Sequence, residues 1–156
     1  MKDVISKINI TEGVSLVTVT GITNDTSQIA TLLTSIAVGG ITLDMIGLSP
    51  LVKGMEISLS FSLDDADLAR VIAVIGKFKK NTLGIHTEVN TGNTKLCVFG
   101  EKMPETPGVA AALLAVLAQN KVDVCLITTS DTDISLLVSE EDTDKTVEAI
   151  KKEFGV

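Results

Sequence analysis

The chain has 156 residues, a formal net charge of −7 and an aromatic content of 3%, with no Trp and no Tyr. Nucleic-acid binding needs a basic surface and uses aromatic side chains as stacking platforms, so this composition argues against it. Hydrophobic residues make up 45% of the chain, enough for a sizeable core, but no apolar run is long enough to span a bilayer. Because the N-terminus also lacks the features of a signal peptide, we expect a cytoplasmic protein without a membrane partner.

The first half of the chain predicts six elements of secondary structure. Strands are indicated by Val- and Thr-rich or alternating apolar runs, and helices by apolar residues at a spacing of three and four. Asp64 is a plausible N-cap of the second helix, and Gly39 ends the first. In order, the predicted elements are strand 16–20, a helix containing 29–36, strand 41–46, strand 55–62, a helix containing 68–75 and strand 83–89, with a turn at 90–93.

The second half of the chain repeats the first. Val17–Gly21 is similar to Leu96–Gly100, and Gly40–Ile46 is similar to Lys121–Ile127. An internal repeat of this kind indicates two copies of one structural unit. The predicted elements of the second copy are strand 95–99, a helix containing 110–117, strand 122–127, strand 134–138 and a helix containing 147–154, capped by Ser139 and ended by Gly155.

Each copy therefore reads strand–helix–strand–strand–helix, and one closing strand would make it a βαββαβ, or ferredoxin-like, unit. Strand 83–89 can close the first copy. The second copy has no strand of its own left, but the apolar N-terminal segment 3–11 is unassigned and can close it. We therefore expect an α+β fold of two units, 12–92 and 93–156 plus 1–11, each an antiparallel sheet with helices on one face.

The sequence offers little for catalysis. It has a single His, His86, and a single Arg, Arg70, with no phosphate-binding glycine loop and no metal-ligand spacing. The two cysteines, Cys97 and Cys125, lie in apolar runs and are expected to be buried free thiols. The acidic clusters at 64–67 and 140–142 stand at predicted helix starts, where capping and the helix dipole account for them. We expect no catalytic site, no metal and no cofactor.

The most informative residues lie before the first helix of the second copy, in the loop 100–110. We expect Pro107 in the first helical turn, where its missing N–H is harmless. Gly108 removes a side chain beside the free backbone N–H groups of the helix start. This combination either simply starts a helix well or forms a docking point for a carboxylate or another anion.

These loop motifs resemble the tandem ACT domains at the C-terminus of aspartokinases. Met103, the stretch 107–111 and the stretch 128–135 are similar to the family's helix-start loop and its Ser-Thr-Ser-Glu-Ile-x-Ile-Ser motif. The final residues 153–155 resemble the family's ending. The resemblance covers nearly the whole chain and implies two ACT units, the second completed by the N-terminal strand.

In this family, ACT units bind small ligands, usually amino acids, and pass the signal to an enzyme. The resemblance implies an amino-acid effector such as lysine or threonine, feedback control of aspartate-family biosynthesis, a homodimer formed through ACT units, and a possible kinase subunit as partner. An interaction module of the same fold that dimerises without a ligand is the alternative. The candidate ligand-binding residues are Asn24, Asp25, Thr26, Ser27, Gln28, Ile29, Leu48, Ser49, Met103, Thr106, Pro107, Gly108, Val109, Ala110 and Ser130.

The first copy departs from the family's pattern. It has the loop 24–27 (Asn-Asp-Thr-Ser) in place of Asp-x-Pro-Gly, and Leu48-Ser49 in place of Gln-Asn. Either its ligand preference has changed, with Asn24 or Asp25 receiving an ammonium group, or this unit is structural. The sequence also leaves open whether the chain acts beside a separate kinase, is part of a longer kinase or regulates another protein.

Overall fold

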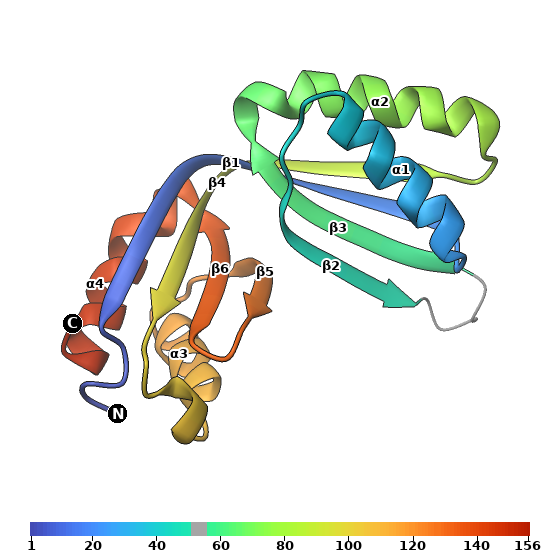
Figure 1. Ribbon diagram of the computed structural model, residues 1–156. Coiled ribbons are helices and arrows are strands. Elements are labelled where there is room, and N and C mark those ends of the chain that lie inside the picture. The colour runs from blue at the N-terminus through green and yellow to red at the C-terminus, as the bar shows by residue number, and fades with distance from the viewer. Residues whose placement is uncertain (51–55) are drawn as a thin grey trace. The chain divides into compact units, whose positions relative to one another are not determined.

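The structure is a computed structural model that describes residues 1–50 and 56–156. Met55, in the predicted strand 55–62, lies outside the described residues. Short 3₁₀ turns, η1 (Asp65–Asp67), η2 (Met103–Glu105) and η3 (Glu140–Asp142), precede three of the helices. The main elements are β1 (Lys7–Thr23), α1 (Thr26–Val38), β2 (Asp44–Pro50), β3 (Glu56–Asp64), α2 (Leu68–Asn81), β4 (His86–Phe99), α3 (Val109–Gln119), β5 (Val124–Thr129), β6 (Asp133–Ser139) and α4 (Thr143–Phe154) (Figure 1).

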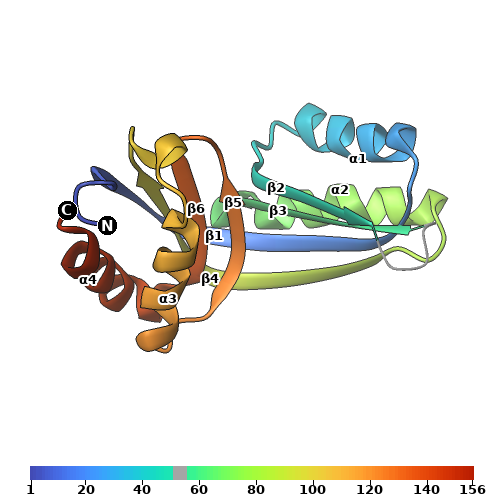
Figure 2. The ribbon, with the colours of Figure 1, turned by 90° about the horizontal axis from the view of Figure 1, so that it is seen from below.

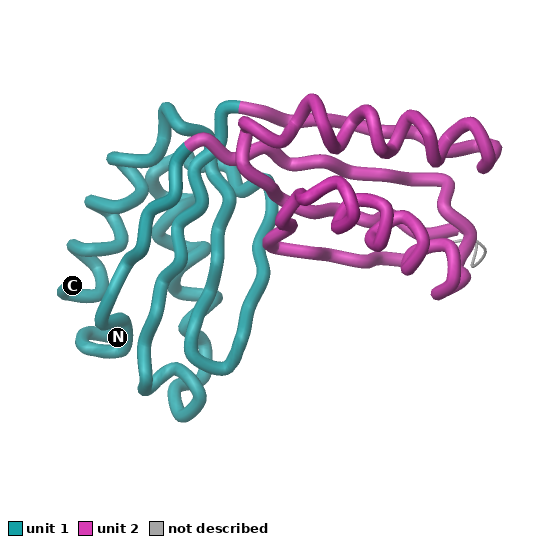
Figure 3. The backbone as a smooth tube through the Cα atoms, turned by 45° about the horizontal axis from the view of Figure 1, so that its top comes forward, with its two compact units in different colours: residues 1–12, 92–156 teal, residues 13–91 magenta. Residues whose placement is uncertain are grey.

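The chain divides into two compact units (Figure 3). The continuous unit consists of residues 13–91, and the split unit consists of residues 1–12 together with 92–156. The N-terminal twelve residues thus belong with the C-terminal half of the chain. The two long strands β1 and β4 each contribute one part to each unit, and they lie side by side in both ribbon views (Figures 1 and 2).

The sheet order is β2-β3-β1-β4-β6-β5, which contains the same four-strand arrangement twice. In the continuous unit, β3 pairs antiparallel with both β1 and β2. In the split unit, β6 pairs antiparallel with both β4 and β5. In each unit the strand that comes third is central and the strand that comes second is at the edge, which is the ferredoxin-like order.

Each unit has its own apolar core between the sheet and a pair of helices. In the continuous unit, Leu32 and Ile36 of α1 and Val71 and Ile75 of α2 are at most 1% exposed, and they pack with β1 and β3 residues such as Phe61. In the split unit, Leu113 of α3 and Ile150 and Phe154 of α4 take the same place. The core of the split unit also contains Val4 and Ile5. Their side chains are 8% and 3% exposed, so the N-terminal segment is part of this core.

Two glycines mark where a closing strand meets each unit. A methyl group on Gly21 would lie 2.1 Å from the carbonyl oxygen of Gly84, and one on Gly100 would lie 1.9 Å from that of Val4. Backbone can approach backbone this closely only where a residue has no Cβ. The segment before β4 therefore closes the continuous unit, and residues 4–5 close the split unit in the equivalent way.

The predicted breaks between strands were wrong. Residues 7–11 of the predicted strand 3–11 and all of the predicted strand 16–20 belong to the single strand β1, while residues 3–6 precede it; the predicted turn at 90–93 lies inside β4. Asn90 and Thr91 are exposed strand residues, and Gly92 has a φ of 72° without ending the strand. Polar residues mark turns because turns face water, and an exposed part of a strand carries the same signal.

Other boundaries also differ from the prediction. Strands 41–46 and 122–127 begin later than predicted, as β2 at Asp44 and β5 at Val124. Ser139 precedes η3 but makes no capping hydrogen bond through its side chain. Asp64 does cap, since its carboxylate accepts the Ala66 N–H at 2.8 Å, but the capped element is η1. Gly155 ends α4 with a φ of 77°, as predicted.

The two cysteines are free thiols, but neither is fully buried, which corrects the expectation for both. Cys97 is half-buried in β4, whereas Cys125 lies exposed on the edge strand β5. Its thiol donates a long hydrogen bond of 3.6 Å to Asn93 Oδ1. Partial desolvation, with the nearby Asp123 carboxylate, raises the pKa of the Cys125 thiol. Among the described helices, none combines the length and apolar character needed to cross a membrane.

Candidate functional site

The predicted site residues of the split unit surround the start of α3. Gly108 is the N-cap, with a φ of 89°, and no side chain within 1–50 or 56–156 caps the helix. The Gly108 carbonyl accepts the Ala112 N–H at 2.9 Å, which is the first hydrogen bond of the helix. The N–H groups of the first turn, including those of Val109 and Ala110, therefore have no capping partner and carry the positive end of the helix dipole.

The role predicted for Pro107 was wrong in one respect. Pro107 precedes the Gly108 cap and so lies outside the first helical turn. Its ring fixes the chain just before the cap, and Gly108 then supplies the left-handed conformation that a residue with a Cβ rarely adopts. The helix begins at Val109, later than a Pro107 in its first turn requires.

Other predicted residues of this loop are structural in part. Met103 and Val109 are 8% and 5% exposed and belong to the core of the split unit. The Thr106 hydroxyl donates to the Lys102 carbonyl at 2.7 Å, which fixes the loop between η2 and α3. These contacts hold the Pro107-Gly108 backbone in place, with both residues exposed.

Ser130 lies in the turn between β5 and β6. Its hydroxyl donates to the Asp133 carboxylate and accepts the N–H groups of Thr132 and Asp133. The Thr132 carbonyl in turn accepts the Gly100 N–H at 2.9 Å. The structure therefore brings the β5–β6 turn next to the end of β4, but it commits the Ser130 side chain to the turn itself.

The start of α1 in the continuous unit has a different chemistry. The Asp25 carboxylate accepts the Ser27 N–H at 2.9 Å and the Ser27 hydroxyl at 2.7 Å. These two hydrogen bonds hold the pKa of the Asp25 carboxyl below its usual value, and the bond from the Ser27 hydroxyl has the larger effect. The Asp25 carbonyl accepts the N–H groups of Gln28 and Ile29. This helix start is closed by its own cap, whereas that of α3 is open.

The remaining predicted residues of the continuous unit are spread out. Asn24 and Thr26 are exposed beside the cap, and the buried Gln28 Oε1 has no hydrogen-bond partner. Leu48 and Ser49 lie on the edge strand β2, opposite Leu59 and Ser58 of β3. Among the described residues, no side-chain hydrogen bond connects these β2 positions to the α1 start.

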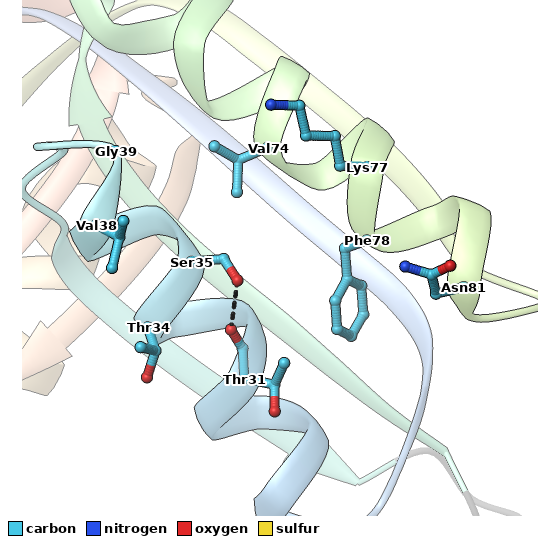
Figure 4. A pocket seen from close by; sticks show the side chains of 9 residues that line it. All are labelled: Thr31, Thr34, Ser35, Val38, Gly39, Val74, Lys77, Phe78 and Asn81. Atoms are coloured by element: carbon cyan, nitrogen blue, oxygen red, sulfur yellow. Dashed lines mark hydrogen bonds between the residues drawn. The ribbon is translucent and has the colours of Figure 1, made fainter.

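Sequence reasoning did not predict the cavity between α1 and α2 (Figure 4). It has a volume of about 470 Å³, and none of the predicted site residues lines it. The Thr31 and Ser35 hydroxyls on its α1 side already donate to carbonyls of their own helix, at 2.8 Å each. Thr34, Lys77 and Asn81 are the other polar residues of the lining. We take the loop at α3 as the candidate site because its helix start has no side-chain cap. The residues that line the cavity are Thr31, Thr34, Ser35, Val38, Gly39, Val74, Lys77, Phe78 and Asn81.

Metal chemistry finds no support in the described residues. Within 1–50 and 56–156, no group of three His, Cys, Asp or Glu side chains is placed to hold a metal ion. His86 is exposed at the start of β4. Arg70 pairs with Asp67 and donates to the Gly39 carbonyl at 3.2 Å, so its guanidinium ties α2 to the end of α1.

The fold and the comparisons first define a class. Residues 96–154 match the family model described as ACT domain. The match lies within the split unit, and the continuous unit has the same ferredoxin-like strand order.

Within that class, the chain resembles the regulatory part of aspartokinases. It is 34% identical over 143 residues to the aspartokinase of Bacillus sp. strain MGA3, covering 90% of this chain and 34% of the relative. The chain thus spans about a third of the length of that curated relative.

Two solved structures share the fold. The regulatory subunit of aspartate kinase from Thermus thermophilus superposes with a TM-score of 0.85 at 17% identity, covering 96% of this chain and 97% of that chain. E. coli aspartokinase III in complex with lysine and aspartate superposes with a TM-score of 0.73 at 16% identity, covering 97% of this chain and 33% of that chain.

Proposed function

We propose that this chain is the regulatory region of an aspartate kinase and that it binds an amino-acid effector, such as lysine or threonine, in feedback control of aspartate-family biosynthesis. The lysine-bound state of E. coli aspartokinase III supports an amino acid as the ligand class. The match with a regulatory subunit over nearly its whole length supports a role beside a kinase chain. We place this role in the cytoplasm as part of the proposal.

The open helix start of α3 carries this proposal. Its uncapped N–H groups at Val109 and Ala110 are suited to a ligand carboxylate, since the helix dipole adds favourable potential at the same point. Met103 and Thr106 hold the loop, and the exposed Gly108 lets a ligand approach the backbone. We infer that the split unit is the sensing unit.

The continuous unit is less suited to bind an effector through the effector's carboxylate. Asp25 already occupies the position that a ligand carboxylate would take at α1. Its negative charge repels a second carboxylate there but would attract an ammonium group. We therefore propose that a ligand at this loop, if it binds at all, presents its amino group to Asp25 and Asn24.

Ligand-independent dimerisation is the second candidate function, and exposed apolar side chains on the edge strands favour it. Ile46 and Leu48 of β2 are 51% and 50% exposed, and Ile127 of β5 is 37% exposed. Unpaired edge strands with apolar side chains are prone to pair with another chain. We propose that β2 forms part of a homodimer contact, which is compatible with effector binding elsewhere.

Calorimetric titration with the common amino acids, including lysine and threonine, tests the effector proposal. A matched pair of variants locates the site: Gly108→Asp adds a carboxylate at the helix start, while Gly108→Asn has a similar shape without the charge. Both residues tolerate the left-handed conformation better than others. Both side chains can accept the free N–H groups of the helix start, but only Asp adds a negative charge, so we expect Gly108→Asp to weaken binding more than Gly108→Asn.

Absence of heat with every amino acid, in a chain that light scattering shows to be a stable dimer, would favour the dimerisation module instead. Equal binding by the two Gly108 variants would place the effector away from α3.

A further inference from the structure

A second polar cavity lies within the split unit, away from the α3 loop. Its volume is about 280 Å³, and it is lined by Glu12, Thr94, Glu140, Thr143 and Asp144. Glu12 comes from β1, Thr94 from β4, and the other three from η3 and the start of α4. Three carboxylates and two hydroxyls therefore face one small space, built from parts of the chain that are distant in sequence.

The hydroxyl of Thr94 is the feature that capping cannot explain. Thr94 is 1% exposed, and its Oγ1 has no hydrogen-bond partner among the residues that the structure describes. A buried hydroxyl without a partner costs free energy, so native proteins rarely retain one without a ligand, water or functional reason. Thr143, by contrast, donates to the Ser139 carbonyl at 3.5 Å.

The equivalent place in the continuous unit is closed. Ser15 stands opposite Leu63, two residues before Asp65, as Thr94 stands opposite Val138, two residues before Glu140. There the Ser15 hydroxyl donates to the Asp65 carboxylate, so both groups are satisfied. In the split unit the hydroxyl and the carboxylate remain apart, with a cavity between them.

The split unit also has more carboxylates at this place than the continuous unit. By the same registers, Glu12 corresponds to Thr91 and Asp144 corresponds to Ala69. The continuous unit therefore has one carboxylate at this place, already bonded to Ser15, and the split unit has three. Among the described residues, no salt bridge neutralises Glu12, Glu140 or Asp144; the salt bridge of this region joins Lys145 to Asp142.

We propose that this cavity binds a small organic cation that carries a primary ammonium group. Carboxylates accept the N–H groups of an ammonium ion in charge-assisted hydrogen bonds, and Thr94 Oγ1 offers a further acceptor at the buried end. The carboxylates are not spaced to hold a metal ion, which favours an organic cation. This site is independent of the effector loop at α3, where the chemistry selects an anion.

The test is a calorimetric titration of the full chain with 1,5-diaminopentane, with 1-pentanol and Mg²⁺ as comparison probes. We expect the diamine alone to bind. Glu140→Gln should weaken its affinity about tenfold, the equivalent of about 1.4 kcal/mol, and Thr94→Val should weaken it as well. The matched control is Glu141→Gln, which removes the same charge from the neighbouring exposed residue of η3 and should leave the affinity unchanged.

Three results would overturn the proposal. Absence of diamine binding would do so directly. Equal weakening by Glu140→Gln and Glu141→Gln would show that the cation responds only to the net charge of −7. Binding of Mg²⁺ that depends on Glu140, without diamine binding, would assign the cavity to a metal ion.

Discussion

Gly100→Ala is expected to detach the N-terminal segment from the split unit. The added methyl group would lie 1.9 Å from the Val4 carbonyl oxygen and 3.3 Å from the Ile5 Cα. Both neighbours are backbone atoms, so no side chain can rotate away. Relief requires the segment to move by about 1.5 Å to reach an ordinary contact of 3.4 Å.

A movement of this size has two costs. It breaks the hydrogen bond from the Ser6 N–H to the Phe99 carbonyl, now 2.9 Å long, and it withdraws Val4 and Ile5 from the core. Overpacking alone costs about 1–3 kcal/mol, and exposing one such side chain costs about 1.5–3 kcal/mol. Since the segment can relieve strain by exposing only part of this surface, we expect a loss of about 3 kcal/mol in the free energy of unfolding.

Urea denaturation of the purified chain measures this loss, and hydrogen exchange at Asp3 and Ser6 shows where it arises, since their N–H groups bond to Phe154 and Phe99. Gly76→Ala is the matched control. A methyl group at Gly76 meets nothing within 4 Å. Because Ala is a better helix former than Gly, this substitution should raise the free energy of unfolding by about 0.5–1 kcal/mol. If Gly100→Ala stays within about 0.5 kcal/mol of the wild type, residues 4–5 do not close this unit as the structure shows.

Three further predictions follow from individual side chains. Thr94→Val should raise the free energy of unfolding by about 1 kcal/mol in the absence of ligand, because it removes an unpartnered buried hydroxyl; a loss measured by urea denaturation would show that the hydroxyl has a partner. The pKa of Asp25 is lower in the folded state than its usual value of 3.8. The ionised Asp25 therefore stabilises the fold above pH 3.8, and this stabilisation is lost as the pH falls below that value. Thermal melts between about pH 5 and 2.5 should therefore fall more steeply for the wild type than for Asp25→Asn, and parallel curves would contradict the cap. Leu48→Lys should shift the dimer towards monomer in light scattering without lowering the melting temperature, because Leu48 is 50% exposed on an edge strand; an unchanged mass would exclude β2 from the contact.

The sequence was sufficient to predict the fold because one of the two units lacked a strand and one apolar segment had not been assigned to any element. The second copy lacked a closing strand, and the apolar residues Val4 and Ile5 were available to fill it. Where the prediction failed, at 90–93, it read polar residues as a turn although these residues lie within the strand β4. Composition reports exposure to water, and exposure alone does not distinguish a turn from an exposed part of a strand.

The two candidate sites differ in how far the sequence could show them. The helix start at Gly108 is local, so its residues can be read from one stretch of chain. The cavity beside Thr94 joins residue 12 to residue 144, and no local pattern connects them. The sequence did contain one indication of this cavity. Ser15 and Thr94 occupy equivalent positions in the two copies, but the residue types and the number of carboxylates around them differ. The acidic residues 140–142 were instead attributed to capping and the helix dipole. They do lie in the first turn of η3, although no side-chain capping hydrogen bond is made before it.

The most direct test of an effector site at the start of α3 is a backbone amide NMR titration of this chain with lysine, threonine and the other common amino acids. Saturation at a hundred times the dissociation constant should also add about 2.7 kcal/mol to the free energy of unfolding. Our account predicts saturable shifts centred on residues 108–111, with little change at 25–29. No shift with any amino acid, or shifts confined to residues outside the α3 loop, would contradict it.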